Sequence, residues 1–437
     1  MSIKSKLGLY SSGPPPSSNS PDSPEGPSGN AARESTTEPE ETLRFGETEL
    51  KREADGFYVR RLILENPVFG TRELNQFLPL TLTGIMELAL SGRNDVIHPG
   101  EVLFLDTETT GLSRGAATFP FLTGLGYFND NRLYLEQLYL DDLGGEPAYL
   151  DYLDALIASY PFMVTYNGKS FDMPLIRNRL IMNRRRGSRP MLHFDLLHIL
   201  RRLFPKGTLP GNKQKDLETA LLGMERVDDV PGSEIPQLYF DYKKYAVDGG
   251  MDRVFHHNLL DIQGMAFMFL EAVRVYREKD LSSPAVRSGL ARILARNERV
   301  REAIEILAPM LADESPPVES SEDDRDIDED KALRRRHLDL LFLAGLYRAR
   351  LEWDEAIRLH TSAVDDFACP VSRLQLAKIL EHRVKDFSAA LGHTDALIEQ
   401  LHGENKETVK APGRDFAADQ LEKRRNRILK KAGGKLA

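Results

Sequence analysis

Cysteine and long apolar runs are both scarce in this chain of 437 residues. Its one cysteine, Cys369, cannot form an internal disulfide or a cysteine-based metal cage. No apolar run approaches the roughly 18 residues that a membrane-spanning helix needs. The first ten residues also lack the apolar core of a secretory signal. We therefore expect a cytoplasmic protein without a membrane helix.

Overall basic charge is also missing, because the net charge is −9. The charge is nevertheless segregated along the chain. Residues 313–330 contain ten acidic side chains and one arginine, whereas residues 173–215 contain eleven basic side chains and one acid. A negative total therefore does not exclude binding of nucleic acid by the basic stretch.

The composition divides the chain into four parts. Residues 1–44 are rich in Ser, Pro and Gly and predict a disordered tail, either a solubilising leader or a partner-binding arm. Residues 45–100 predict an extension packed on an α/β domain at 101–280. Residues 281–437 are helical in pattern, with an acidic disordered insert at 313–331.

Apolar patterning in the second quarter of the chain predicts an alternation of strands and helices. The order is β-β-β-α-β-α-β-α, which is the connectivity of an RNase H-like α/β fold with a mixed sheet. A long helix at about 249–277 follows. The expected strands are 102–106, 121–128, 132–140, 162–166 and 191–195, and the expected helices are 148–159, 173–183 and 196–204.

Alanines recur at fixed spacings in the C-terminal part. Ala344, Ala356 and Ala363 are separated by 12 and 7 residues, and the same spacings recur 33 residues later. Ala291 and Ala303 give a third copy. With Tyr347 and Trp353, this region resembles tetratricopeptide repeats, which would recruit a protein partner. An unrelated helical bundle is the alternative.

Two carboxylates, Asp106 and Glu108, lie at positions i and i+2 at the end of an expected strand. Their side chains therefore point to one face, where they repel each other unless a divalent cation lies between them. Oxygen ligands of this kind suit Mg²⁺ or Mn²⁺. Alone, the pair is a weak signal, because a solvated strand end has the same pattern.

Two further motifs strengthen the interpretation of Asp106 and Glu108 as metal ligands. Asp172 follows an Asn-Gly turn and Phe171, and Asp261 lies on the long helix after two adjacent histidines. Together, the three segments resemble the DEDD exonuclease superfamily, whose motifs are D-x-E, N-x3-F-D and a histidine or tyrosine four or five residues before a final Asp. Asp172 taken alone would be read as a helix cap.

The resemblance implies a two-metal nuclease. Asp106, Glu108, Asp172 and Asp261 would hold two Mg²⁺ or Mn²⁺ ions, and a histidine would activate the attacking water. His256 has the five-residue spacing to Asp261 and His257 the four-residue spacing, so both are candidates. On a continuous helix, residues four apart share a face, which favours His257. Residues beside these motifs are expected to contact substrate, namely Thr109, Asn167 and Phe171.

The segment between the second and third motifs narrows the resemblance to YprB-like RNase H-like proteins. In that family a similar connector precedes an H-N-x2-D element, here His257, Asn258 and Asp261, and tetratricopeptide-like repeats often follow. The matching connector residues are Leu217, Glu218, Gly223, Arg226, Asp228, Asp229, Pro231, Gly232, Ile235 and Pro236.

A basic cluster follows directly on Asp172 and predicts a surface that binds a nucleic-acid strand, although a solvated face would have the same composition. Asp195, near His193 and His198, is either a helix cap or a contact to the site or substrate. The cluster comprises Arg177, Arg179, Arg184, Arg185, Arg186, Arg189, Arg201, Arg202 and Lys206.

These features predict a metal-dependent nuclease, an exonuclease on single-stranded or frayed DNA or RNA. The alternative is a catalytically weak scaffold that binds nucleic acid and recruits partners through the helical repeats. A more remote alternative is an enzyme that uses the same metals on small nucleotides, which the basic cluster disfavours. The complete carboxylate set favours the nuclease.

Overall fold

The computed structural model defines most of the chain. All structural statements below refer to the residues it describes, which are 41–77, 82, 84–93, 95–111, 117–187, 192–205, 209, 211–246, 249–279, 281, 283–312, 325–403 and 417–433. The predicted tail lies outside these residues up to residue 40, and so does the acidic insert from 313 to 324.

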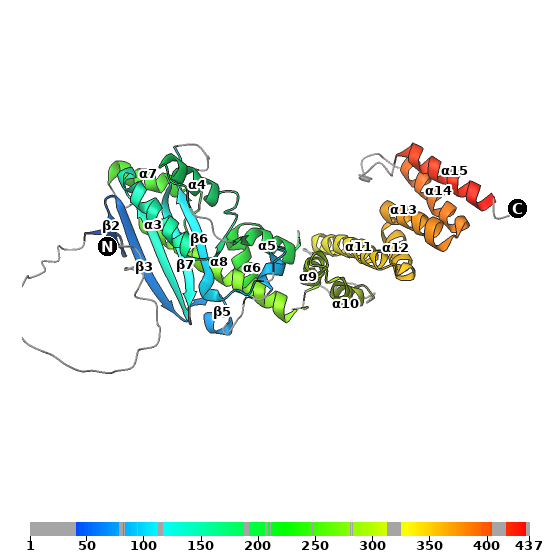
Figure 1. Ribbon diagram of the computed structural model, residues 1–437, viewed down its shortest axis with the longest axis horizontal. Helices are drawn as coiled ribbons and strands as arrows, with labels where there is room; N and C mark the ends of the chain where they lie inside the picture. Colours follow the sequence, from blue (N-terminus) through cyan, green and yellow to red (C-terminus); the bar gives the residue numbers. More distant parts are fainter. Residues whose placement is uncertain are drawn as a thin grey trace, which may run out of the picture. The chain divides into compact units, whose positions relative to one another are not determined.

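The centre of the fold is a mixed sheet of eight strands in the order β1-β2-β3-β8-β7-β6-β9-β10 (Figure 1). Strands β7 and β8 run antiparallel to their neighbours, whereas β6, β9 and β10 run parallel to one another. The predicted mixed sheet is therefore confirmed. The five strands are β6 (Val102–Thr109), β7 (Pro120–Asn129), β8 (Arg132–Leu140), β9 (Phe162–Thr165) and β10 (Leu192–Asp195).

Three N-terminal strands extend this sheet at the β8 edge. They are β1 (Thr42–Phe45), β2 (Thr48–Ala54) and β3 (Phe57–Glu65), and β3 pairs with β8 along its whole length. The predicted end of the disordered tail, residue 44, is wrong. Residues 42–44 belong to β1, which pairs with β2 and whose last residue, Phe45, is buried. Smaller elements follow, namely β4 (Val68–Phe69), β5 (Arg72–Glu73), η2 (Leu74–Phe77), α2 (Ile85–Leu88) and η3 (Pro99–Glu101).

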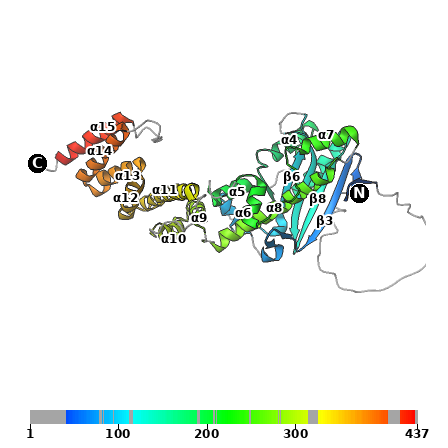
Figure 2. The same ribbon diagram turned by 180° about the vertical axis from the view of Figure 1, so that it is seen from behind.

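Helices cover both faces of the sheet, so β6 is buried on both sides. Its odd-numbered residues Leu103 and Leu105 pack against α3 (Glu146–Ser159) and α4 (Asp172–Met182). The even-numbered Phe104 packs on the other face against α8, with its ring centroid 5.6 Å from that of Phe269. Figure 2 shows α8 (Met251–Glu278) crossing the sheet on this second face.

Three shorter helices complete this part of the molecule. They are α5 (Leu196–Leu203), α6 (Gln214–Leu222) and α7 (Ile235–Tyr245). Helix α6 packs closely on α8 because Gly264 has no side chain, and a Cβ there would lie 1.8 Å from Oε1 of Glu218. This close approach brings the start of α6 beside the functional residues of α8.

The C-terminal part consists of helices that contact their neighbours in chain order. A short π-helical segment, η5 (Leu380–Val384), directly continues the helix that ends at Ile379. Ala291, Ala344 and Ala377 lie fully buried on alternate helices, as do Ala303 and Ala356 on the intervening ones. The predicted helical region is confirmed. Its helices are α9 (Pro284–Arg296), α10 (Val300–Ala312), α11 (Arg325–Ala349), α12 (Trp353–Phe367), α13 (Pro370–Ile379), α14 (Phe387–Gly403) and α15 (Ala418–Gly433).

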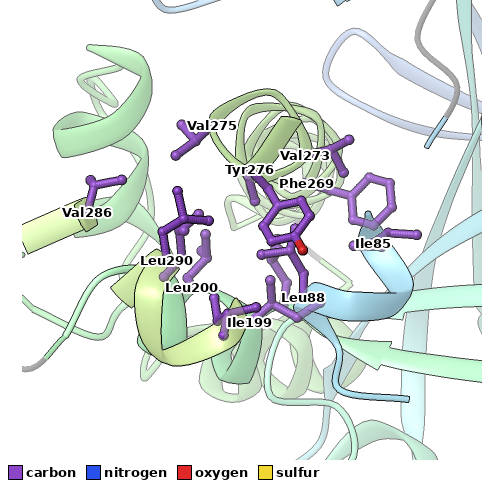
Figure 3. Close-up of a cluster of buried hydrophobic side chains, with 14 of the residues drawn as sticks. Ile85, Leu88, Ile199, Leu200, Phe269, Val273, Val275, Tyr276, Val286 and Leu290 are labelled. Atoms are coloured by element: carbon purple, nitrogen blue, oxygen red, sulfur yellow. The ribbon is translucent and has the colours of Figure 1, made fainter. Parts of the chain in front are cut away.

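One hydrophobic core joins α8 to helices on either side of it in the sequence. In Figure 3, Tyr276 of α8 lies near Leu88 of α2 and Phe269 lies near Ile85 of α2, while Leu290 of α9 lies near Leu200 of α5. Within the described part of the chain, no helix is both long and apolar enough to cross a membrane.

Candidate metal-dependent active site

The first three carboxylates meet at the carboxyl end of β6. Asp106 and Glu108 point to the same face as Phe104, whereas Thr107 lies on the opposite side and donates a hydrogen bond from its hydroxyl to Oδ1 of Asp172. Asp172 is the first residue of α4 and is 8% exposed. The turn before α4 therefore delivers the third carboxylate to the strand that carries the first two.

Helix α8 supplies the remaining groups. Nε2 of His257 lies 3.3 Å from Oδ2 of Asp261 and 4.0 Å from Oε1 of Glu108. One ligand atom from each of these three residues lies within 4.8 Å of the other two. Helix α8 and strand β6 thus bring together groups that are about 150 residues apart in the sequence.

The two candidate histidines are placed differently. Helix α8 already includes residue 256, so His257 and Asp261 share a face and His256 points elsewhere. The His256 side chain is exposed, and in the described part of the chain no hydrogen bond or ion pair reaches it. The geometry therefore favours His257.

Asp106 is held by residues that the sequence motifs did not single out as site residues. Nδ2 of Asn258 donates to Oδ2 of Asp106 at 3.0 Å, and Nε2 of Gln137 donates to Oδ1 of Asn258 at 3.1 Å. Gln137 lies on β8 and also donates to the carbonyl oxygen of Phe255 at 2.7 Å. Asn258 is fully buried, so this chain of hydrogen bonds fixes the direction of the Asp106 carboxylate.

Asp261 is held by a buried arginine. Nη2 of Arg226 lies 2.5 Å from Oδ1 of Asp261 and 2.7 Å from Oε1 of Glu218, and Nη1 lies 3.2 Å from Oδ2 of Asp229. The Arg226 side chain is 4% exposed and that of Glu218 is fully buried. Sequence analysis identified Arg226 only as a connector residue, because its partner Asp261 lies 35 residues further along the chain, on α8.

Burial and mutual repulsion perturb the carboxyl groups. Burial raises the pKa of Asp106, and the charges of Asp261 and Glu108 raise it further. Burial raises the pKa of Glu108 to about 8, although His257 opposes the shift. Burial likewise raises the pKa of Asp172 to about 6 despite the Thr107 hydrogen bond.

His257 and Asp261 are shifted in the opposite sense, towards their charged forms. Burial alone would lower the pKa of His257, but the hydrogen bond to Asp261 and the charges of Asp261 and Glu108 raise it to about 10. Burial alone would raise the pKa of Asp261, but His257 and Arg226 lower it. The cluster therefore stabilises a positive charge among its carboxylates.

A divalent cation fits this donor set. Asp106 and Glu108 are oxygen donors in a buried site, where burial raises the pKa of both and neighbouring carboxylates add to the shift. Carboxylate oxygens are ligands for Mg²⁺ and Mn²⁺. Asp106 and Asp172 are not part of the close group formed by Glu108, His257 and Asp261, so the donors extend over more than one position.

Two adjoining cavities flank the carboxylates. The first, of about 430 Å³, is lined by Asp106, Glu108 and Asp172, and the second, of about 600 Å³, by His257 and Asp261. Both are bordered by Lys213 and Gly232. The predicted substrate residues Thr109, Asn167 and Phe171 all line the first cavity.

Phe171 and Asn167 are placed for contact with a ligand. The Phe171 ring is 50% exposed at the rim of the first cavity. Asn167 has a φ of 62° in the turn before α4. The carboxylate of Asp195 accepts hydrogen bonds from the backbone N–H groups of Asn167 and Lys169 at 3.0 and 3.2 Å.

Of the two roles expected for Asp195, a helix cap or a contact to the site or substrate, the structure does not show the cap. Asp195 precedes α5, but its side chain makes no capping hydrogen bond there. The neighbouring parallel strand β9 ends beside it, so its carboxylate reaches the turn that follows β9 instead. It supports the turn that carries Asn167.

The basic cluster divides into exposed and paired members. Arg177, Arg184 and Arg186 are exposed. Arg179 is buried in an ion pair with Glu146 at 2.5 Å, and Arg185 pairs with Asp151. Including Arg179 in a strand-binding surface was therefore wrong, because it lies on the buried face of α4. Arg189 and Lys206 lie outside the described residues.

The exposed arginines lie at different distances from the site. Arg177 is on the second turn of α4, close to Asp172, whereas Arg184 and Arg186 follow the far end of the helix. At 1.5 Å per residue, that end is roughly 15 Å from Asp172. Arg201 donates to Oδ1 of Asn212, and Arg202 donates to the carbonyl oxygens of Leu88 and Ala89.

Comparisons with known proteins agree with this architecture. Residues 103–272 match the family model described as the RNase_H superfamily. The chain is also similar to YprB of Bacillus subtilis (strain 168), described as an uncharacterized protein, with 28% identity over 333 residues that cover 74% of this chain and 75% of YprB. The family match includes β6 from residue 103 onward and α8 up to residue 272. The two matches support an RNase H-like domain at residues 103–272 with nuclease-type chemistry on phosphodiester bonds.

Proposed function

We propose that this chain is a DEDD-type exonuclease that hydrolyses phosphodiester bonds with two Mg²⁺ or Mn²⁺ ions. The observation that carries the proposal is the meeting of β6, α4 and α8, where Glu108 and Asp261 face Nε2 of His257 and where Asp106 and Asp172 line the adjoining cavity with Glu108. A purely structural cluster would not require several carboxylates close together in a buried site, where burial and then their mutual repulsion raise the pKa of Asp106.

The residues divide into metal holders and a base. Asp106, Glu108, Asp172 and Asp261 would hold the ions, which stabilise the negative charge that develops during in-line displacement. His257 is the general base, because Nε2 faces the carboxylates and can accept a proton from the attacking water. Cations bound to Glu108 and Asp261 would offset the negative charges that raise the pKa of His257.

The substrate is a single-stranded or frayed end of DNA or RNA. The first cavity combines the exposed ring of Phe171 with Asn167 and Thr109, which suits a base stacked on an aromatic ring beside polar contacts. Arg177, exposed on the second turn of the helix that begins with Asp172, would contact a phosphate of the same strand, and Arg184, Arg185 and Arg186 would contact it further along.

The helical region is the part that would bind a protein partner. Its helices contact one another in chain order, and buried alanines recur on alternate helices, as in tetratricopeptide-like repeats. A pull-down with residues on α12 and α14 substituted would identify such a partner independently of the nuclease activity.

End-labelled single- and double-stranded DNA and RNA, incubated with the purified chain and Mn²⁺, test the proposed activity. We expect stepwise shortening from one end that EDTA abolishes. Asp106→Asn keeps the shape of the side chain and removes its charge, so it should lose at least two orders of magnitude of activity. Glu53→Gln, at an exposed salt bridge on β2, is a control for loss of one carboxylate. Equal cleavage by Asp106→Asn and the parent protein would refute the proposal.

A further inference from the structure

We propose that Asp229 is a positioning residue that orients His257 for the reaction. The inference rests on the proposed function, in which His257 is the general base. Oδ1 of Asp229 lies 2.7 Å from Nδ1 of His257, on the side of the ring away from the carboxylate cluster. Asp229 belongs to the connector before α7, not to any of the three carboxylate motifs.

The hydrogen bond at one ring nitrogen determines what the other nitrogen offers. A carboxylate only accepts hydrogen bonds, so Nδ1 of His257 must carry the proton that points to Asp229. Nε2 then lies towards Asp261 and Glu108, at 3.3 and 4.0 Å. In the neutral ring this leaves the lone pair of Nε2 directed to the site.

Asp229 is itself held in place. Nη1 of Arg226 lies 3.2 Å from its other oxygen, Oδ2, while Nη2 of the same arginine lies 2.5 Å from Oδ1 of Asp261. Arg226 is anchored by Glu218, which has no exposed surface. Arg226 therefore holds both carboxylates that contact His257, with Asp229 at Nδ1 and Asp261 at Nε2.

Burial distinguishes this arrangement from a surface ion pair. The side chains of Asp229, His257 and Arg226 are 12%, 13% and 4% exposed. The neighbouring Val230 is buried, which anchors the connector at the next residue. The position of Asp229 is thus set by packing as well as by its charged partners.

Replacing Asp229 by Asn gives a definite expectation. Arg226 has only donors, so it would take the amide oxygen of the new side chain. The NH₂ group would then face Nδ1 of His257 and require that nitrogen to accept. The ring proton would move to Nε2, which could no longer accept a proton from water. Asp229→Ala removes the partner without imposing the wrong tautomer.

Kinetics and histidine NMR of the full chain test this role together. For Asp229→Asn we expect kcat to fall by on the order of 10- to 100-fold with KM nearly unchanged, because the base acts in the transition state. Protein labelled with ¹⁵N-histidine should show a hydrogen-bonded Nδ1–H of His257, assigned with His257→Gln, which both Asp229 variants lose. Asp228→Asn removes the same charge from the adjacent, exposed residue and should change neither measurement.

The outcomes separate this inference from the proposed function. An Asp229→Asn protein that keeps its kcat, or a parent protein without the Nδ1–H resonance, would overturn the positioning role. An equal loss in Asp228→Asn would also overturn it, since charge alone would then explain the effect. If the parent protein cleaves no strand, the proposed nuclease fails, while the resonance and its loss in the variants still decide how His257 is oriented.

Discussion

Asn258 donates a hydrogen bond to Asp106 at 3.0 Å, from the residue that directly follows His257 on α8. The contact joins the first and last motifs of the site through a side chain that is neither a carboxylate nor a base. It also explains why Gly124 on β7 has no side chain, since a Cβ there would lie 2.3 Å from Oδ1 of Asn258.

Asn258→Ala should therefore lower activity without removing any proposed ligand. We expect kcat/KM to fall by about 10- to 100-fold, because Asp106 loses the group that orients it. The free energy of unfolding should fall by about 1–3 kcal/mol, because the buried amide of Gln137 loses an acceptor. Steady-state kinetics and urea unfolding measure the two effects. Unchanged kinetics would show that Asp106 needs no support from α8.

Stability without metal should fall as the pH rises. The folded-state pKa of Glu108 is raised from 4.5 to about 8, so its contribution is fully present below pH 4.5 and is lost as the pH rises through 8. His257 acts in the same direction. Its pKa is raised from 6.5 to about 10, so its contribution to the free energy of unfolding is fully present below pH 6.5 and is lost as the pH rises through 10. Thermal melting in EDTA from pH 5 to pH 9 measures the fall.

Added Mg²⁺ should reduce this pH dependence, because it binds the ionised carboxylates of the native state only. Glu108→Gln should reduce it as well, since the amide resembles the protonated carboxyl group. A melting temperature in EDTA that rises over the same range would contradict the raised pKa of Glu108.

Gly264→Ala should disturb the site indirectly, through the contact between α8 and Glu218 of α6. The new Cβ would lie 1.8 Å from Oε1 of Glu218, which Arg226 and Gln214 hold in place. We expect a loss of about 1–3 kcal/mol in the free energy of unfolding from overpacking, together with reduced activity. Gly345→Ala on α11 is the matched control, because nothing lies within 4 Å of its Cβ. As a helical substitution whose new Cβ meets no neighbour, it should stabilise the protein by about 0.5–1 kcal/mol.

Arg177 and Arg179 should respond differently to substitution. Arg177→Ala should weaken strand binding and lower the slope of log affinity against log salt by about 0.7, the value for one contact to a single strand. Arg179→Ala should instead lower the free energy of unfolding by about 3–5 kcal/mol, because it leaves Glu146 buried without its partner. Fluorescence anisotropy at several salt concentrations and denaturant unfolding distinguish them. A loss of binding by stable Arg179→Ala would contradict its structural role.

The sequence was sufficient to predict the mixed sheet and to select the residues that meet at the site. The apolar run at 102–106 was sufficient to predict β6, and the spacing of Asp106 and Glu108 was sufficient to predict that their side chains share a face. The choice between His256 and His257 needed the start of α8, which continues through both residues and leaves only His257 towards Asp261.

Long-range support could not be predicted in the same way. Gln137 meets Asn258 across 121 residues, and Arg226 meets Asp261 across 35, and neither pairing leaves a local pattern. Charge composition also could not show that Arg179 is buried and Arg177 exposed. That difference depends on which side of α4 each residue occupies. The same limit applies to Asp195, whose partners lie on the neighbouring strand's turn.

The packing of α9 against α5 determines where the chain can be cut. A Cβ at Gly289 would lie 2.1 Å from the carbonyl oxygen of Leu203, and Leu290 is fully buried in the core shown in Figure 3. Removing everything after residue 280 would therefore leave α5 and α8 with an exposed apolar surface, and the shortened protein would tend to aggregate. The first helices of the C-terminal region are part of the folding unit of the nuclease-like domain, whatever the later helices bind.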